Sequence, residues 1–170
     1  QARELLLRER MDAFTQLHPL RVGDVFHIPP LLPHALQHGV RVVEFQTPSY
    51  ERKFISFAQK VITQDQWDSR EAVARMLLRG PAMVAPRKLP GPPGVTVEQI
   101  VDFPDFEVLR LAINPGMQWQ VGSGSSYSLL LVVTGTLEVV GSRYGAEQAV
   151  LLPRGWSGAL QAPQASAPVV

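Results

Sequence analysis

A proline-rich stretch near the middle of the chain limits its possible folds more than any other feature. The segment PAMVAPRKLPGPP places five prolines between Pro81 and Pro93. Because proline lacks a backbone N–H and fixes φ, such a segment cannot continue a helix or a central strand. The sequence therefore predicts an irregular, extended connector over 81–96, which separates a first domain at 1–80 from a second domain at 97–170.

The second domain has the pattern of a series of short β-strands. Its segments VEQIVDF, FEVLRLAINPG, SYSLLLVVTGTLEVVG, QAVLLPRG and SGALQAP are rich in Val, Leu and Ile and are separated by Gly and Pro turns. This spacing is typical of an antiparallel sandwich or barrel. In the first domain, LRVGDVFHIP and GVRVVEFQT have the same character, so antiparallel β-structure is expected over 20–60 as well as 97–170.

Two short helices are predicted in the first domain. Apolar residues recur near helical spacing across 3–15. A second helix is expected over 69–79, because Asp68 and Glu71 form a capping pattern at its start and Gly80 offers a C-terminal cap. The predicted fold class is therefore mostly β with one or two short helices.

Composition excludes several classes of function. Sixteen Lys and Arg residues balance fifteen Asp and Glu residues without a basic stripe, so nucleic acid and membranes are not expected partners. The chain has no Cys, which excludes disulfides, thiolate metal sites and cysteine nucleophiles. No signal peptide and no apolar run of about 18 residues is present, so a cytoplasmic location is expected. Because the chain begins at Gln1 rather than Met, a fragment of a longer protein is expected.

One strand–turn–strand unit occurs twice, once in each domain. In the first copy, GDVFHIPPLLPHA, five residues separate Gly23 from Pro29 and four more separate Pro29 from His34. In the second copy, GAEQAVLLPRGWSGA, seven residues separate the glycine from Pro153, and again four residues separate Pro153 from Gly158. Two copies in tandem indicate two related β-barrels.

This spacing resembles the second sequence motif of the cupin superfamily, whose small β-barrels carry a metal on inward-facing histidines. The first copy keeps His34 but has Leu31 where the family has glycine, whereas the second keeps Gly155 but has Gly158 in place of the histidine. The stretch NPGMQWQVGSGSSYSLLLVVTGTLEVV resembles the first cupin motif with its His-x-His replaced by Gln-Trp-Gln at 118–120. The resemblance implies a second barrel without metal ligands.

A metal-bearing barrel followed by one without ligands resembles the bicupin layout of type I phosphomannose isomerases. The resemblance implies a tandem cupin, made of two double-stranded β-helix or jelly-roll barrels, of which the first is incomplete here. It also implies metal-dependent aldose–ketose isomerisation of a sugar or sugar phosphate in the intact parent protein. A divalent metal, zinc above all, would polarise the carbonyl and hydroxyl while an acid/base moves the proton.

The resemblance implies roles for three residues of the first domain. His34 matches the metal ligand of the second motif, and the family's other zinc ligands would lie upstream of Gln1. Glu44 and Arg52 are the catalytic candidates. Phe54 occupies the position of the family's arginine, and period-two alternation would place Arg52 on the same face as Phe54. Because zinc needs three or four ligands, an empty or incomplete site is expected in this chain.

Each candidate in the first domain also has a purely structural interpretation. His34 would then be a turn histidine that binds a backbone carbonyl at a barrel rim. Glu44 would need a partner or would face outward, because burying a lone carboxylate is costly. His27 and His38 are expected at the surface.

A non-catalytic role is the alternative for the whole chain. Trp119 and Trp156 fall at the degraded ligand positions of the second barrel, where aromatic bulk would fill the metal pocket. The chain would then be a bicupin that binds a sugar or small ligand, or that serves as an assembly partner. Since the first domain has too few strands to close a barrel, its open edge and apolar inner face predict a homo-oligomer that associates through the first domain.

Overall fold

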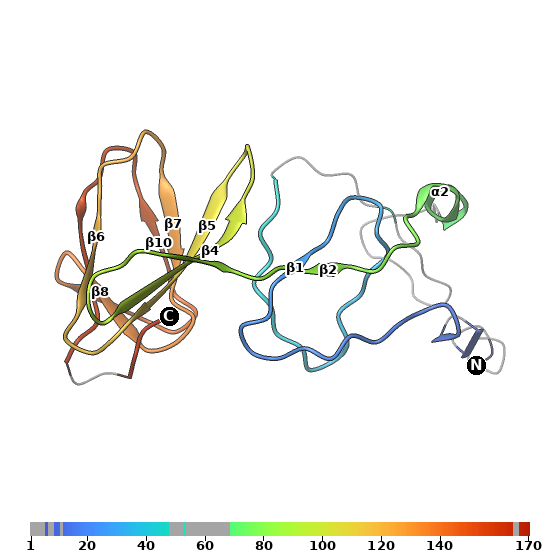
Figure 1. Ribbon diagram of the computed structural model, residues 1–170, viewed down its shortest axis with the longest axis horizontal. Coiled ribbons are helices and arrows are strands. Elements are labelled where there is room, and N and C mark those ends of the chain that lie inside the picture. Colours follow the sequence, from blue (N-terminus) through green and yellow to red (C-terminus); the bar gives the residue numbers. More distant parts are fainter. Residues whose placement is uncertain (1–5, 7–8, 11, 48–52, 54–68, 165–166) are drawn as a thin grey trace. The chain divides into compact units, whose positions relative to one another are not determined.

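The computed structural model describes residues 6, 9–10, 12–47, 53, 69–164 and 167–170. Within these residues the protein is mostly β, with several antiparallel sheets, which confirms that part of the prediction (Figure 1). The chain divides into two units, Gln1–Val84 and Ala85–Val170, and the division falls inside the proline-rich segment. Among the described residues, no helix has the length and apolarity needed to cross a membrane.

Unit 1 contains one short β-ladder in its described part. β1 (Phe26–His27) pairs antiparallel with β2 (Ala82–Met83), and the Val84 N–H extends the ladder to the Val25 carbonyl at 2.9 Å. The strand predicted from GVRVVEFQT is wrong, because residues 39–47 form no strand. A strand needs a neighbour that completes its ladder of hydrogen bonds, and the described part of unit 1 offers this segment none.

The helix α2 (Ser69–Arg75) begins where the sequence predicts and ends four residues earlier than expected. Helical hydrogen bonding continues to Met76, but the Leu77 N–H donates instead to the Leu31 carbonyl at 2.8 Å. This tertiary bond ends the helix, so Gly80 is not its cap. The residues with helical conformation in the helix predicted over 3–15 are Leu6, Glu9, Arg10 and Asp12.

Unit 2 consists of short strands joined by turns. They are β3 (Arg87–Leu89), β4 (Val95–Asp102), β5 (Glu107–Ile113), β6 (Gln118–Val121), β7 (Ser128–Leu131), β8 (Thr136–Val139), β9 (Ser142–Gly145), β10 (Ala149–Leu152) and β11 (Gly158–Gln161). The irregular connector predicted over 81–96 is wrong in part, because it contains β2, β3 and the start of β4. Its prolines lie outside these strands and therefore take no ladder position.

The strands of unit 2 form three antiparallel sheets, one of which is β3–β4–β5. One sheet has the order β6–β11–β8–β9, and β7 pairs with β10. Two residues at the end of the chain lie between β5 and β7: Val169 forms a bridge with Ile113, and Val170 exchanges hydrogen bonds of 3.3 Å with Thr134. Residues 169–170 therefore link the sheet β3–β4–β5 to the residues that follow β7.

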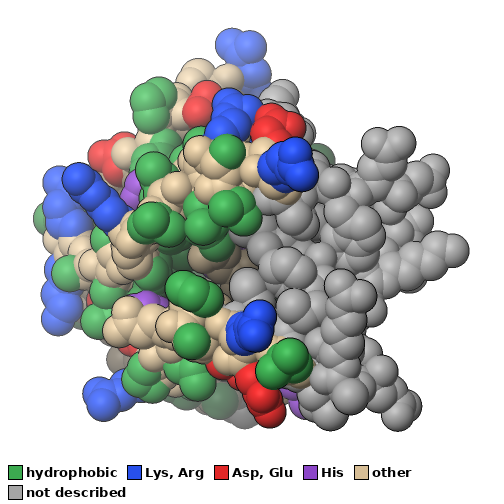
Figure 2. All heavy atoms as spheres, turned by 90° about the vertical axis from the view of Figure 1, so that its right-hand side faces the viewer, with side chains coloured by type: hydrophobic (Ala, Val, Ile, Leu, Met, Phe, Trp, Pro, Cys, Tyr) green, Lys and Arg blue, Asp and Glu red, His purple; other side chains and the backbone are tan. Residues whose placement is uncertain are grey.

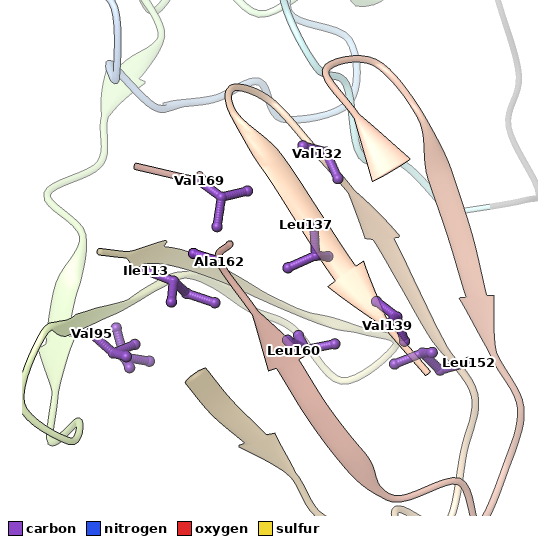
Figure 3. Close-up of a cluster of buried hydrophobic side chains, with 10 residues drawn as sticks. Val95, Ile113, Val132, Leu137, Val139, Leu152, Leu160, Ala162 and Val169 are labelled. Carbon is purple, nitrogen blue, oxygen red and sulfur yellow. The ribbon is translucent and has the colours of Figure 1, made fainter. Parts of the chain in front are cut away.

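A single apolar cluster fills the interior of unit 2 (Figure 3). Strands such as β4 and β8 contribute alternate residues to it, as period-two geometry requires. Leu160 and Ile113 are each 2% exposed. The ten buried members are Val95, Val97, Ile113, Val132, Leu137, Val139, Leu152, Leu160, Ala162 and Val169.

Candidate functional site

The repeated sequence unit forms the same turn in both units. In each copy the N–H of the fourth turn residue donates to the carbonyl of the first, at 3.2 Å in turn 29–32 and 3.1 Å in turn 153–156. The third residue has a positive φ in both, 66° at Leu31 and 78° at Gly155. A positive φ at this position is typical of type II turns and favours glycine. Leu31 thus adopts a left-handed conformation that favours glycine, at a cost of roughly 1–2 kcal/mol.

His34 lies two residues beyond the first of these turns, with its side chain at the surface. Its ring nitrogen Nδ1 lies 2.9 Å from the Leu32 carbonyl oxygen. Because a carbonyl only accepts, Nδ1 carries the proton and the neutral ring keeps its lone pair on Nε2. This is the contact expected of a turn histidine. It is also the orientation that backbone carbonyls impose on metal-binding histidines.

Of the three predicted site residues, the structure describes His34 and Glu44. Glu44 lies in the segment 39–47, which forms no strand, and its exposed side chain avoids the cost of a buried carboxylate. Arg52 lies outside the described residues. Among the residues that the structure describes, no group of three or more His, Asp and Glu side chains could hold a metal ion. The His, Asp and Glu side chains that the structure describes therefore do not fit a zinc site.

The remaining histidines of unit 1 do not converge on His34 either. His27 and His38 are exposed, as predicted. The His18 ring packs at 6.5 Å from the ring of Phe26, at an interplanar angle of 59°. An open hollow of about 580 Å³ lies elsewhere in unit 1 and is lined by Asp12, Thr15, Gln16, Leu17 and Gln37.

In unit 2, a tryptophan of each motif-like segment lies beside the apolar interior. Gln118 and Gln120 on β6 are exposed, so the half-buried Trp119 is the inward residue of this motif. At the motif-two position, a Cβ added to Gly158 would lie 2.7 Å from the Trp156 ring. Both tryptophans pack against the buried cluster.

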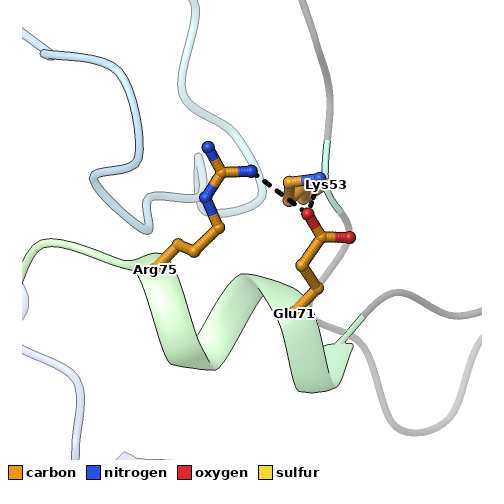
Figure 4. Close-up of polar contacts among 3 residues, drawn as sticks. All are labelled: Lys53, Glu71 and Arg75. Carbon is orange, nitrogen blue, oxygen red and sulfur yellow. Dashed lines mark hydrogen bonds and ion pairs between the residues drawn. The ribbon is translucent and has the colours of Figure 1, made fainter.

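A cluster of three charged side chains anchors α2, and the sequence did not indicate its third member (Figure 4). The Glu71 carboxylate lies 3.0 Å from Lys53 Nζ and 3.1 Å from Arg75 Nη1. Hydrogen bonds from Lys53 and then from Arg75 hold the pKa of Glu71 below its ordinary value of 4.5. Asp68, the other residue of the predicted capping pattern, lies outside the described residues. The contact between Arg75 and Glu71 could be predicted from their i, i+4 spacing, whereas the contact with Lys53 is tertiary.

A second polar cluster joins the three strands β3, β4 and β5 of unit 2. Arg87 donates to the Gln99 side-chain oxygen from Nε at 2.9 Å and from Nη2, and the Gln99 amide donates to Glu107 at 2.6 Å. On the same strands Arg110 and Glu98 form an ion pair of 2.8 Å. These contacts fix strand register. Sequence patterns do not reveal them, because Arg87 lies in the proline-rich segment where no strand is expected.

Comparison of the chain with family models, curated proteins and solved structures finds no match.

Proposed function

We propose that the chain is a tandem cupin related to bicupin sugar isomerases, and that it acts as a non-catalytic assembly module. The strand order of unit 2 supports the fold. An eight-stranded jelly roll needs two antiparallel sheets. In this proposal the sheet β6–β11–β8–β9 is one of them, and β5 and the pair β7–β10, linked through residues 169–170, make the other. The shared turn at 29–32 and 153–156 supports the relation between the two units.

One observation carries the non-catalytic role. The Trp156 ring covers the position that a side chain at Gly158 would occupy, and the interior beside it is packed with apolar residues. Among the described residues no polar or charged side chain is buried. A site that binds a sugar or a metal needs convergent polar groups in a concave space, and the packed interior of unit 2 supplies none. Contact with a partner through the outer surface is therefore the better-supported role.

The exposed apolar side chains of unit 1 support an assembly role for this unit also. Figure 2 shows hydrophobic side chains at the surface among scattered charges. Val42, Val43 and Phe45, in the segment predicted as a strand, are each about half exposed, at 48–50%. Their exposure supports the proposal, made first from the strand count, that unit 1 associates with a partner.

A metal-dependent isomerase is the second candidate, and it rests on His34 alone. The Leu32 carbonyl fixes the proton on Nδ1 and leaves the Nε2 lone pair for a metal. Any other zinc ligand would have to come from residues that the structure does not describe. Glu44 and Arg52 keep their proposed catalytic roles in this candidate.

Metal loading separates the two candidates. The protein would be incubated with Zn²⁺, desalted and analysed for bound zinc by mass spectrometry, alongside His34→Ala and the control His38→Ala, which is also a surface histidine. The non-catalytic proposal expects the same low zinc content in all three proteins and no interconversion of a hexose phosphate by NMR. Stoichiometric zinc that is lost only in His34→Ala would overturn it in favour of the isomerase candidate.

A further inference from the structure

The outer face of β7 and β10 is apolar, although it lies at the surface. Inward residues alternate with the outward residues Leu129 and Leu131 on β7, and Leu151 on β10 points the same way. Leu129 is 67% exposed and Leu151 is 61% exposed, and the two are directly opposite each other in the ladder. We name this surface the β7–β10 face; its residues are Leu129, Leu131, Val133, Ala149 and Leu151.

The neighbouring sheet β3–β4–β5 shows that a polar outer face is possible in this unit. On β4 and β5 the outward positions hold Thr96, Glu98 and Arg110, of which the last two form the 2.8 Å ion pair. Strands with one solvated face normally alternate apolar and polar residues. The run LLLVV at 129–133 is apolar on both faces, which is the pattern of a strand covered on both sides.

We infer that the β7–β10 face binds the same face of a second copy of this chain around a two-fold axis. None of its five residues is charged, so the face can meet itself without like-charge repulsion, as a two-fold interface requires. Leu129 and Leu151 lie opposite each other in the ladder, so a two-fold axis that runs between the two strands and parallel to them brings Leu129 of one copy towards Leu151 of the other. The inference names the partner for the proposed assembly role and rests on that role.

The size of the face fits a weak, reversible dimer. Its side chains expose on the order of 500 Å² per copy, which is as large as the largest apolar patch of a typical monomer. Two copies together would bury on the order of 1,000 Å², near the lower limit for a specific interface. The expected dissociation constant is therefore micromolar rather than nanomolar.

Sedimentation of the full chain over about 1–100 µM tests this inference against the alternatives. Leu129→Lys and Leu151→Lys should each raise the dimer dissociation constant by about tenfold or more, because each buries a charge at the centre of the face. Thr96→Lys adds the same charge to the polar outer face of β4 and should leave dimerisation unchanged. Circular dichroism verifies that each variant remains folded.

Other outcomes would overturn the inference. A monomeric wild-type chain at every concentration would do so, as would Lys variants of Leu129 and Leu151 that still dimerise. If Phe45→Lys abolished association and these variants did not, the contact would belong to unit 1. None of these results would decide whether the chain is catalytic, because the zinc and isomerisation measurements test that separately.

Discussion

The two units of this chain carry similar densities of Val, Leu and Ile, yet their described residues differ greatly in burial. Unit 2 has ten buried apolar residues in one cluster. Among the described residues of unit 1, only Leu32 and Ala72 are buried, at 8% and 5% exposure. The difference lies in pairing rather than composition. The strands of unit 2 have partners on both sides of a core, whereas the apolar segment 39–47 of unit 1 has no strand beside it in the described structure.

Truncation of one leucine in each unit should give the largest difference in the free energy of unfolding. Leu160→Ala should lower the free energy of unfolding of unit 2 by about 2–5 kcal/mol, because it leaves a cavity in a packed core. Leu160 is 2% exposed, whereas Leu36 in unit 1 is 56% exposed. Leu36→Ala should therefore change stability by less than about 0.5 kcal/mol. Urea denaturation followed by circular dichroism measures both; equal losses would mean that unit 1 has a core of comparable strength.

The site of the missing motif histidine gives the next largest effect. Gly158→Ala should destabilise unit 2 by about 1–3 kcal/mol, because the new Cβ lies 2.7 Å from the Trp156 ring. Gly122→Ala is the matched control, since nothing lies within 4 Å of a Cβ at that position. If the ring is the cause, a Trp156→Leu background should remove most of the loss that Gly158→Ala produces in urea denaturation. A harmless Gly158→Ala would show that the ring moves away easily.

The two equivalent turns should respond to substitution with opposite signs. Leu31→Gly should stabilise turn 29–32 by about 1 kcal/mol, because it relieves a non-glycine residue at φ 66°. Gly155→Ala should destabilise turn 153–156 by a similar amount, roughly 1 kcal/mol, because alanine is strained at a φ of 78°. Nothing lies within 4 Å of the added Cβ, so the backbone strain is the cause of this loss. Hydrogen exchange of the amides in each turn measures the local change. The same sign at both turns would contradict their equivalence.

The charged cluster on α2 gives the smallest expected effect. Because the pKa of folded Glu71 is below 4.5, its contribution to stability is present above the unfolded pKa and is lost as pH falls through the folded pKa. Thermal melts from about pH 6 to about pH 3 should therefore lose less stability in Glu71→Gln than in the wild type. The effect is small because the carboxylate is exposed to solvent screening. Parallel curves for the two proteins would rule out this contribution.

Local sequence patterns were sufficient for most strands of unit 2. β4, β5, β10 and β11 coincide with apolar runs bounded by Gly and Pro, so their existence follows from propensity and turn chemistry. β3 could not be predicted, because prolines surround it and its ladder with β4 is tertiary. The prediction for segment 39–47 was wrong for the opposite reason. Its residues have a high strand propensity, but a strand forms only where a neighbouring strand pairs with it.

The candidate site was less predictable than the fold. Motif spacing identified His34, and the repeated turn behind it is present, but spacing cannot specify which ligands converge on a histidine. Lys53 was missed because its contact with Glu71 depends on a tertiary approach. The position of Trp156 beside Gly158 is consistent with their spacing of two residues, and Trp156 packs against the buried cluster.

The placement of Val169 and Val170 between β5 and β7 has a consequence for the order of folding during synthesis. Ile113 meets its bridge partner only after the ribosome has made residue 169, so this long-range contact cannot guide the early chain. Contacts between residues so far apart in the sequence slow folding, and apolar strand edges stay exposed until these contacts form. The nascent unit therefore depends on its hairpins, such as β8–β9, to persist until the closing residues leave the exit tunnel.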